Sequence, residues 1–238
     1  MAHNLLKTVV IAGVGPGVGS ATARAFQKEG YHVALLSRSM DYLSSLANEL
    51  GNATAVQCDL TDKDSVASAA RAISGMPPVE VVVLNVGGPS TFRRGSVLDM
   101  DADDLAKAVS ARTVGPLRLL QHLLPSMIER KEGSIFFTGA TASLRGSANF
   151  AYVAVPAFST RALAESTARE LMPLGLHVSH LVLDGIVDSE NARGWKPDAG
   201  PDDLIQPSRV ADTFLMLHRQ PKSVWTFELI VRPANEIW

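Results

Sequence analysis

The chain has 238 residues, of which 46% are hydrophobic and 19% are charged, and its net charge is −2 at pH 7. This balance is typical of one globular α/β domain whose core is large enough to need no disulfide or metal ion. It argues against a basic surface for nucleic acid or anionic membranes, and no apolar run approaches the roughly 20 residues that span a bilayer.

Short β-branched runs alternate with amphipathic segments along the chain. Strands are expected at 8–12, 32–37, 53–58, 79–85, 134–138, 177–183 and 226–231. Helices are expected at 18–29, 40–50, 62–74, 103–130, 158–172 and 207–218. This alternation predicts an α/β Rossmann fold, a doubly wound parallel sheet of about seven strands with helices on both faces, in a single domain spanning 1–238.

A glycine-rich turn joins the first expected strand to the first expected helix. Its candidate cofactor-binding residues are Gly13, Gly15, Pro16, Gly17, Val18 and Gly19. Gly13 permits the tight turn, Gly17 lets the backbone approach a diphosphate, and Gly19 allows close packing of helix on strand. The helix N-terminus adds N–H donors and the positive end of its dipole. Because the turn has a strand before it and a helix after it, a dinucleotide site is favoured over a purely structural turn.

The second expected strand ends in Ser37 and Arg38. NAD-binding proteins usually place an acidic residue at this point, whereas an arginine suits the 2′-phosphate of NADP. Ser37 stands at the acidic position, so the sequence favours NADP(H) over NAD(H). The alternative is that Arg38 is an ordinary surface arginine.

The single cysteine, Cys58, lies at an expected strand end and cannot form an internal disulfide, which indicates a reducing compartment. The first expected strand starts too early to leave room for a signal peptide, so a cytoplasmic location is expected. No spacing of histidine, cysteine or acidic residues resembles a metal site, and none is expected. Residues 190–206 match no regular element and are predicted to form a substrate lid.

Several motifs resemble those of the short-chain dehydrogenase/reductase family, and the resemblance covers the whole chain. Beyond the glycine turn, Asp59-Leu60 matches an adenine-contacting pair, and Asn85-Val86-Gly87 is similar to the end of an Asn-Asn-Ala-Gly motif. Residues 184–189 are similar to a Pro-Gly-x-x-x-Thr segment, with Asp184 for proline and Ser189 for threonine. The further cofactor contacts that the resemblance implies are Asp59, Leu60, Asn85, Val86, Gly87, Gly185, Val187 and Ser189.

The chain most resembles a divergent bacterial subgroup, through the runs 137–146 and 225–233. Enzymes of the family use a tyrosine as acid and base, a lysine four residues later, a serine and an asparagine. An ungapped alignment puts Val153, Ala157, Ala140 and Arg112 at these four positions. A one-residue gap restores Tyr152 as the tyrosine but puts Pro156 and Gly139 at the lysine and serine positions. Lysine is absent from 132–195, so a free phenol with a pKa of about 10 lacks its cation in either alignment.

Tyr152 and Arg112 are the weak candidates for replacement chemistry. Tyr152 is either a hydrogen-bond donor in the pocket or a packed tyrosine, and Arg112 either binds a carboxylate or pairs with a nearby acid. Ser143, Arg145 and Asn149 are candidate substrate contacts, whereas His177 and His180 are interpreted as structural. Pro156 predicts that the active-site helix starts near Val155 or bends there.

Three functional hypotheses follow, and catalytic activity itself is left undecided. The first is a carbonyl or alcohol oxidoreductase that uses NADP(H) with non-standard or weak proton delivery. The second is a lyase, dehydratase or isomerase that reuses the cleft, and the third is a non-catalytic dinucleotide-binding partner protein. By the resemblance, a homodimer or homotetramer is expected to form through the helices 103–130 and 158–172.

Overall fold

The computed structural model describes residues 6–87 and 94–236 of the chain. Its strands form one parallel sheet in the order β3-β2-β1-β4-β5-β6-β7. The strands are β1 (Thr8–Ala12), β2 (His32–Ser37), β3 (Ala53–Gln57), β4 (Val79–Leu84), β5 (Ser134–Ala140), β6 (His177–Leu183) and β7 (Glu228–Val231). The order reverses between β1 and β4, as in a doubly wound sheet, and the predicted single-domain Rossmann fold is confirmed.

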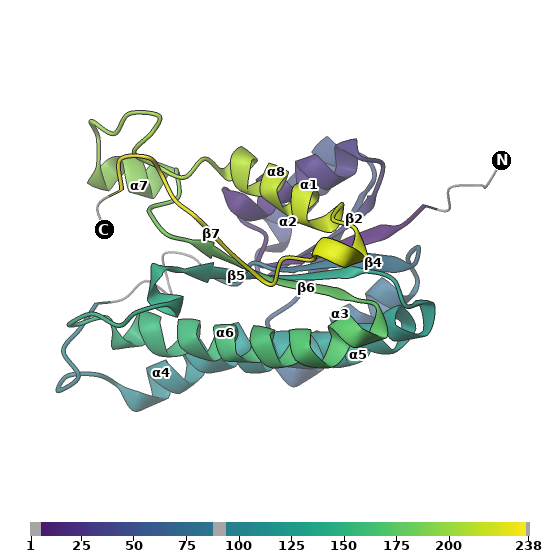
Figure 1. Cartoon of the computed structure of the whole chain (residues 1–238), viewed down its shortest axis with the longest axis horizontal. Coiled ribbons are helices and arrows are strands. Elements are labelled where there is room, and N and C mark those ends of the chain that lie inside the picture. Colours follow the sequence, from purple (N-terminus) through teal and green to yellow (C-terminus); the bar gives the residue numbers. More distant parts are fainter. Residues whose placement is uncertain (1–5, 88–93, 237–238) are drawn as a thin grey trace.

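Helices cover both faces of the sheet (Figure 1). One face carries α1 (Val18–Lys28), α2 (Met40–Leu50) and α8 (Pro207–His218), and the other carries α3 (Lys63–Ser74), α4 (Ala102–Val109), α5 (Gly115–Arg130) and α6 (Ala151–Leu171). Side chains alternate along each strand, so each face of the sheet has its own hydrophobic core. Val9 and Ile11 pack in the core beneath α1, α2 and α8, whereas Val10 and Ala12 pack in the core beneath α3, α5 and α6. In the described part of the chain, no helix combines the length and apolarity needed to cross a membrane.

The predicted helix over 103–130 is interrupted by a π-helical segment, Ser110–Val114, between α4 and α5. Such segments are rare and are often found at functional sites. Two contacts hold this one against α6. The Thr160 hydroxyl donates to the Arg112 carbonyl at 3.1 Å, and the hydroxyls of Thr113 and Ser159 lie 2.7 Å apart.

The predicted start of the active-site helix near Val155 is wrong, because α6 begins at Ala151 and contains Pro156. Helical hydrogen bonding is established before the proline is reached. The backbone N–H groups of Val153 and Ala154 already donate to the Phe150 carbonyl, at 3.0 and 2.8 Å. The missing N–H of Pro156 therefore removes one bond from a helix that has already formed.

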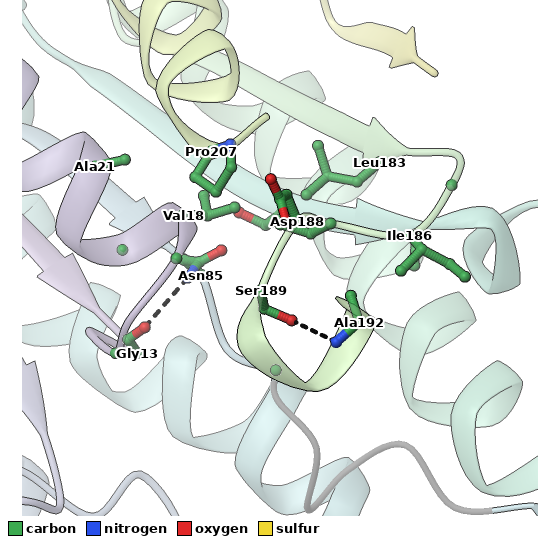
Figure 2. A pocket seen from close by; sticks show the side chains of 18 of the residues that line it. Gly13, Val18, Ala21, Asn85, Leu183, Ile186, Asp188, Ser189, Ala192 and Pro207 are labelled. Atoms are coloured by element: carbon green, nitrogen blue, oxygen red, sulfur yellow. Dashed lines mark hydrogen bonds between the residues drawn. The ribbon is translucent and has the colours of Figure 1, made fainter. Parts of the chain in front are cut away.

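Residues 190–206 are also more ordered than predicted, because α7 (Glu190–Trp195) occupies the first part of the segment. Its N-cap is Ser189, whose hydroxyl accepts a hydrogen bond from the Ala192 N–H at 3.1 Å (Figure 2). A parallel bridge joins Val187, just before the segment, to Ile205, near its end. The result is a closed loop beyond β6.

Candidate active site

A cavity of about 1720 Å³ opens where the central strands end. Its wall includes residues that follow β1, β4 and β6, together with the last residues of β5. Figure 2 shows Gly13 and Asn85 at one side and Asp188 and Ser189 at another. Ligands of doubly wound sheets bind in this crevice, at the point where the strand order reverses.

The first glycine of the turn is locked between β1 and β4. Gly13 has φ 88°, and a Cβ on it would lie 2.1 Å from the Asn85 carbonyl oxygen. The Asn85 side-chain amide also donates to the Gly13 carbonyl at 3.2 Å (Figure 2). A Cβ on Gly19 would lie 2.9 Å from the same carbonyl, so α1 packs closely on the turn. Only glycine fits these two positions.

The other two glycines face open space. Gly17 has φ 132° and is the N-cap of α1, and Gly15 precedes it in the turn. A Cβ on either one would meet no atom within 4 Å. The backbone at the N-terminus of α1 is therefore open to the cavity, as a diphosphate requires. All six predicted residues of the turn line this cavity, and so do Asn85, Val86, Gly87, Gly185, Val187 and Ser189.

The residues predicted at the adenine end lie at the ends of β2 and β3, outside the lining of this cavity. The Ser37 hydroxyl is buried with no hydrogen-bond partner in the described part of the chain, and Arg38 is exposed. The Thr61 backbone N–H and hydroxyl lower the pKa of the Asp59 carboxyl, and the charge of Arg38 adds to this effect. Leu60 instead packs on Gly115, and a Cβ on Gly115 would lie 2.1 Å from the Leu60 carbonyl oxygen.

Arg112 lies on the cavity wall but is only 7% exposed. Its Nε has no hydrogen-bond partner among the described residues, and burial lowers the pKa of its guanidinium. The hydroxyl of Thr138, also on the wall, is buried and likewise without a partner in that part of the chain. Both residues therefore carry a buried polar atom that is unpaired within the described residues.

His180 lies beneath the cavity floor. A Cβ on Gly139 would lie 2.2 Å from its Nε2, which has no hydrogen-bond partner within the described residues. Its Nδ1 is 2.9 Å from a carboxylate oxygen of Glu228, which Arg161 contacts at 2.7 Å. Burial lowers the pKa of His180, so the ring is neutral near pH 7 and its Nδ1–H donates to Glu228.

Tyr152 points away from the cavity, although its neighbour Val153 lines it. The Tyr152 hydroxyl accepts a hydrogen bond from the Asp101 N–H at 2.5 Å and donates to the Asp101 carbonyl at 3.3 Å. Asp101 is the N-cap of α4, so the tyrosine links α6 to α4. This arrangement favours the packed tyrosine over the acid.

Comparison with known proteins decides the family. A family model described as short chain dehydrogenase matches residues 7–200. The chain belongs to the short-chain dehydrogenase family. An uncharacterised oxidoreductase of Staphylococcus aureus is 24% identical over 234 residues, which cover 96% of this chain and 97% of that protein. Dehydrogenase/reductase SDR family member 7B of Danio rerio is 32% identical over 188 residues, covering 74% of this chain and 59% of that protein.

Solved structures of other proteins share the fold. A short-chain dehydrogenase from Rhodopseudomonas palustris is 32% identical, with a TM-score of 0.81, over 95% of this chain and 98% of its own. An alcohol dehydrogenase of the archaeon Thermococcus sibiricus, solved with 5-hydroxy-NADP, is 24% identical, with a TM-score of 0.85, over 98% of both chains. The described cavity thus belongs to a fold that other proteins use with a dinucleotide bound.

The chain has apolar side chains where the ungapped alignment puts the tyrosine and lysine of the family. Val153 lines the cavity and Ala157 is fully buried behind it. Both belong to a small apolar cluster with Ala142 and Ala154, against which Phe150 packs. Among the candidate substrate contacts, Arg145 lines the cavity, whereas Ser143 is fully buried and accepts a hydrogen bond from the Ala140 N–H at 3.1 Å. Asn149 is exposed and outside the lining.

Sequence reasoning missed two buried charged contacts near the site. One is the Glu228 partner of His180, which arises because these two residues are paired between β6 and β7. The other is Asp184, which accepts a hydrogen bond from the Thr141 hydroxyl at 2.6 Å and lies 3.2 Å from an Arg232 nitrogen. The unusual aspartate in the Pro-Gly motif was visible in the sequence, but its partner lies 48 positions away in the chain.

Proposed function

We propose that the protein is an NADP(H)-dependent oxidoreductase that interconverts a carbonyl and an alcohol, with atypical proton delivery. The observation that carries the proposal is the open glycine turn, which shares one cavity with the buried guanidinium of Arg112. The proposed reaction takes a hydride and a proton to the carbonyl, giving the alcohol and the oxidised dinucleotide.

The residues present fit a nicotinamide dinucleotide. The turn offers open backbone at Gly15 and Gly17 for the diphosphate, and the buried Ser37 hydroxyl lacks a partner among the described residues. Arg38 beside it supplies positive charge suited to a 2′-phosphate, which favours NADP(H). When bound, the cofactor supplies or accepts the hydride, while the protein orients and shields the reacting groups. Two structures of this fold were solved with NADP or 5-hydroxy-NADP.

The chain lacks the usual residues for proton transfer to the substrate. With Val153 and Ala157 at the family's tyrosine and lysine positions, the described wall has no phenol beside an ammonium group there. General acid–base catalysis typically contributes about 10²–10⁴-fold, so we expect slow turnover with the proton taken from water. Arg112 can still polarise or orient an oxygen of the substrate.

The cofactor preference is tested with Arg38→Ala. We expect the dissociation constant for NADPH, measured by fluorescence titration, to rise about tenfold, since a hydrogen bond to a charged group contributes about 1.5–3 kcal/mol. The constant for NADH should change less than about twofold. Arg169→Ala, at an exposed arginine of α6, is the control. Equal losses for both cofactors contradict the NADP preference, and no binding of either at millimolar concentration contradicts the whole proposal.

A non-catalytic dinucleotide-binding protein is the second candidate, and the apolar side chains of Val153 and Ala157 at the tyrosine and lysine positions favour it. The two candidates differ in one measurement. Consumption of NADPH with any member of a carbonyl panel supports the oxidoreductase. Tight binding of NADPH without consumption across the panel supports the second candidate.

Two structural proposals accompany this function. Residues 190–206 act as a lid, which is supported by Asn191, Trp195 and Lys196 on the cavity wall. The chain also forms a homodimer or homotetramer through α5 and α6, as exposed apolar side chains on these helices suggest.

A further inference from the structure

The backbone that carries Arg112 is held in place by α6. Arg112 sits in the middle of the π-helical segment, which the Thr160 hydroxyl and the Thr113–Ser159 pair fasten to α6. The side chain is 93% buried and reaches the cavity wall, and its Nε has no partner in the described part of the chain. Contacts within the protein therefore fix the backbone position of Arg112.

A buried guanidinium without a counter-charge is unfavourable. Arginine stays protonated at all ordinary pH values, so it cannot relieve the cost of burial by losing its proton. Burial is the influence that acts on the pKa of Arg112, and no carboxylate of the described residues opposes it. Buried charges in proteins are normally paired. An anion that enters the cavity would complete this site.

The surrounding wall is also suited to an anion. The lining residues between positions 85 and 153 include Arg94, Arg112 and Arg145 and no acidic side chain among those described. Arg94 lies over the Phe150 ring, 4.6 Å from its centroid, at the same end of the cavity. The acidic lining residues, such as Asp188 and Asp212, come from the lid segment, α8 and other parts of the wall. The described lining residues from 85 to 153 therefore carry positive charge only, while Arg24, Lys28 and Lys196 add positive charge on other parts of the wall.

We propose that Arg112 binds a carboxylate group of the substrate, so that the substrate is a carbonyl or hydroxy compound bearing a carboxylate. This inference rests on the proposed function, because substrate and cofactor share the cavity. The planar fork of a guanidinium matches the two oxygens of a carboxylate, and Arg112 lies on the cavity wall. Arg112 is a binding and specificity residue in this scheme.

The test compares acids with their neutral esters on the NADP⁺-loaded protein. Pyruvate, 4-methyl-2-oxopentanoate and phenylglyoxylate are titrated calorimetrically beside their methyl esters. We expect at least one acid to bind about tenfold or more tightly than its ester, as a bidentate charged contact implies. Arg112→Met should abolish this difference and leave the dissociation constant for NADP⁺ unchanged within about twofold. Arg169→Met, at the exposed ion pair with Glu165, should retain it.

Folding of the variant is followed separately. Arg112→Met replaces an unpaired buried charge by an apolar side chain of similar length. The melting temperature of the unliganded variant should therefore equal or exceed that of the wild type. Should Arg112→Met fail to fold, Arg112→Lys keeps the charge without the fork and should weaken binding of the acid about tenfold.

Three results overturn the inference. The first is that none of the acids binds more tightly than its ester, and the second is that Arg112→Met retains the preference. The third is a loss of NADP⁺ affinity in Arg112→Met, which would assign the guanidinium to the cofactor. Phenyl phosphate is titrated in parallel. If phenyl phosphate binds more tightly than phenylglyoxylate, the group that Arg112 binds is a phosphate ester and the carboxylate proposal is wrong. Because NADP⁺ binding is measured by itself, failure of the cofactor proposal is distinguished from failure of this one.

Discussion

At Tyr152 and Val153, a shift of one residue decides what faces the cavity. Successive residues of a helix are about 100° apart around its axis, so the two side chains point in different directions. In α6 it is Val153 that lines the cavity, while Tyr152 bonds to the backbone of Asp101. The sequence left both alignments open, because the ungapped alignment needs no insertion whereas the gapped one restores a tyrosine.

Tyr152→Phe tests whether this hydroxyl is structural. We expect the free energy of unfolding to fall by about 1 kcal/mol, the usual value of one hydrogen bond, because the Asp101 N–H loses its acceptor. NADPH binding and NADPH consumption should be unchanged. Chemical denaturation and steady-state kinetics measure the two effects, with Tyr42→Phe on α2 as the control. A large loss of turnover with unchanged stability would restore Tyr152 as the acid.

At the scale of elements, the strands follow from their residues more closely than the helices do. The buried β-branched runs of β1, β2 and β6 have the predicted bounds. The π-helical segment differs from the prediction because the neighbouring helix α6 contacts it. Thr160 bonds the carbonyl of Arg112, 48 positions away in the chain, so local propensity does not reveal this contact. The start of α6 has a local cause, since hydrogen bonds to the Phe150 carbonyl form the first turn before the proline is reached.

The segment 190–206 is expected to become protected when the cofactor binds. Several of its residues line the cavity. The bridge at its base, the short α7 and polar contacts such as Asn235 to Asp203 hold it in place. We expect NADP⁺ to slow amide hydrogen exchange in 190–206 about tenfold, as a lid that closes over a ligand should show. Exchange in α2, which has no residue on the cavity wall, is the internal control. Equal protection of both segments, or of neither, contradicts a lid.

At the scale of the molecule, the helical face of α5 and α6 exposes apolar side chains that a monomer usually buries. Val155 and Phe158 on α6 are each 43% exposed, and Leu117 on α5 is 39% exposed. These two helices cover the same face of the sheet (Figure 1). Covering this surface with a second copy would remove apolar area from water.

Phe158→Glu should therefore shift the protein towards the monomer, because a carboxylate would be buried in the interface. Light scattering coupled to size-exclusion chromatography measures the mass at several protein concentrations. Met216→Glu is the matched control, since Met216 is 47% exposed on α8, on the opposite face of the sheet. A wild-type protein that is monomeric at about 100 µM contradicts the proposed interface, since such affinity is too weak for a stable dimer.

The sequence by itself determined the sheet architecture, the glycine turn and the lack of a lysine between 132 and 195. These properties depend on residue type, spacing and periodicity within short stretches. Only the tertiary structure decided that Arg112 reaches the cavity wall, that Tyr152 does not, and that His180 pairs with Glu228. These facts depend on helix rotation and strand pairing, which bring together groups that the sequence keeps dozens of residues apart.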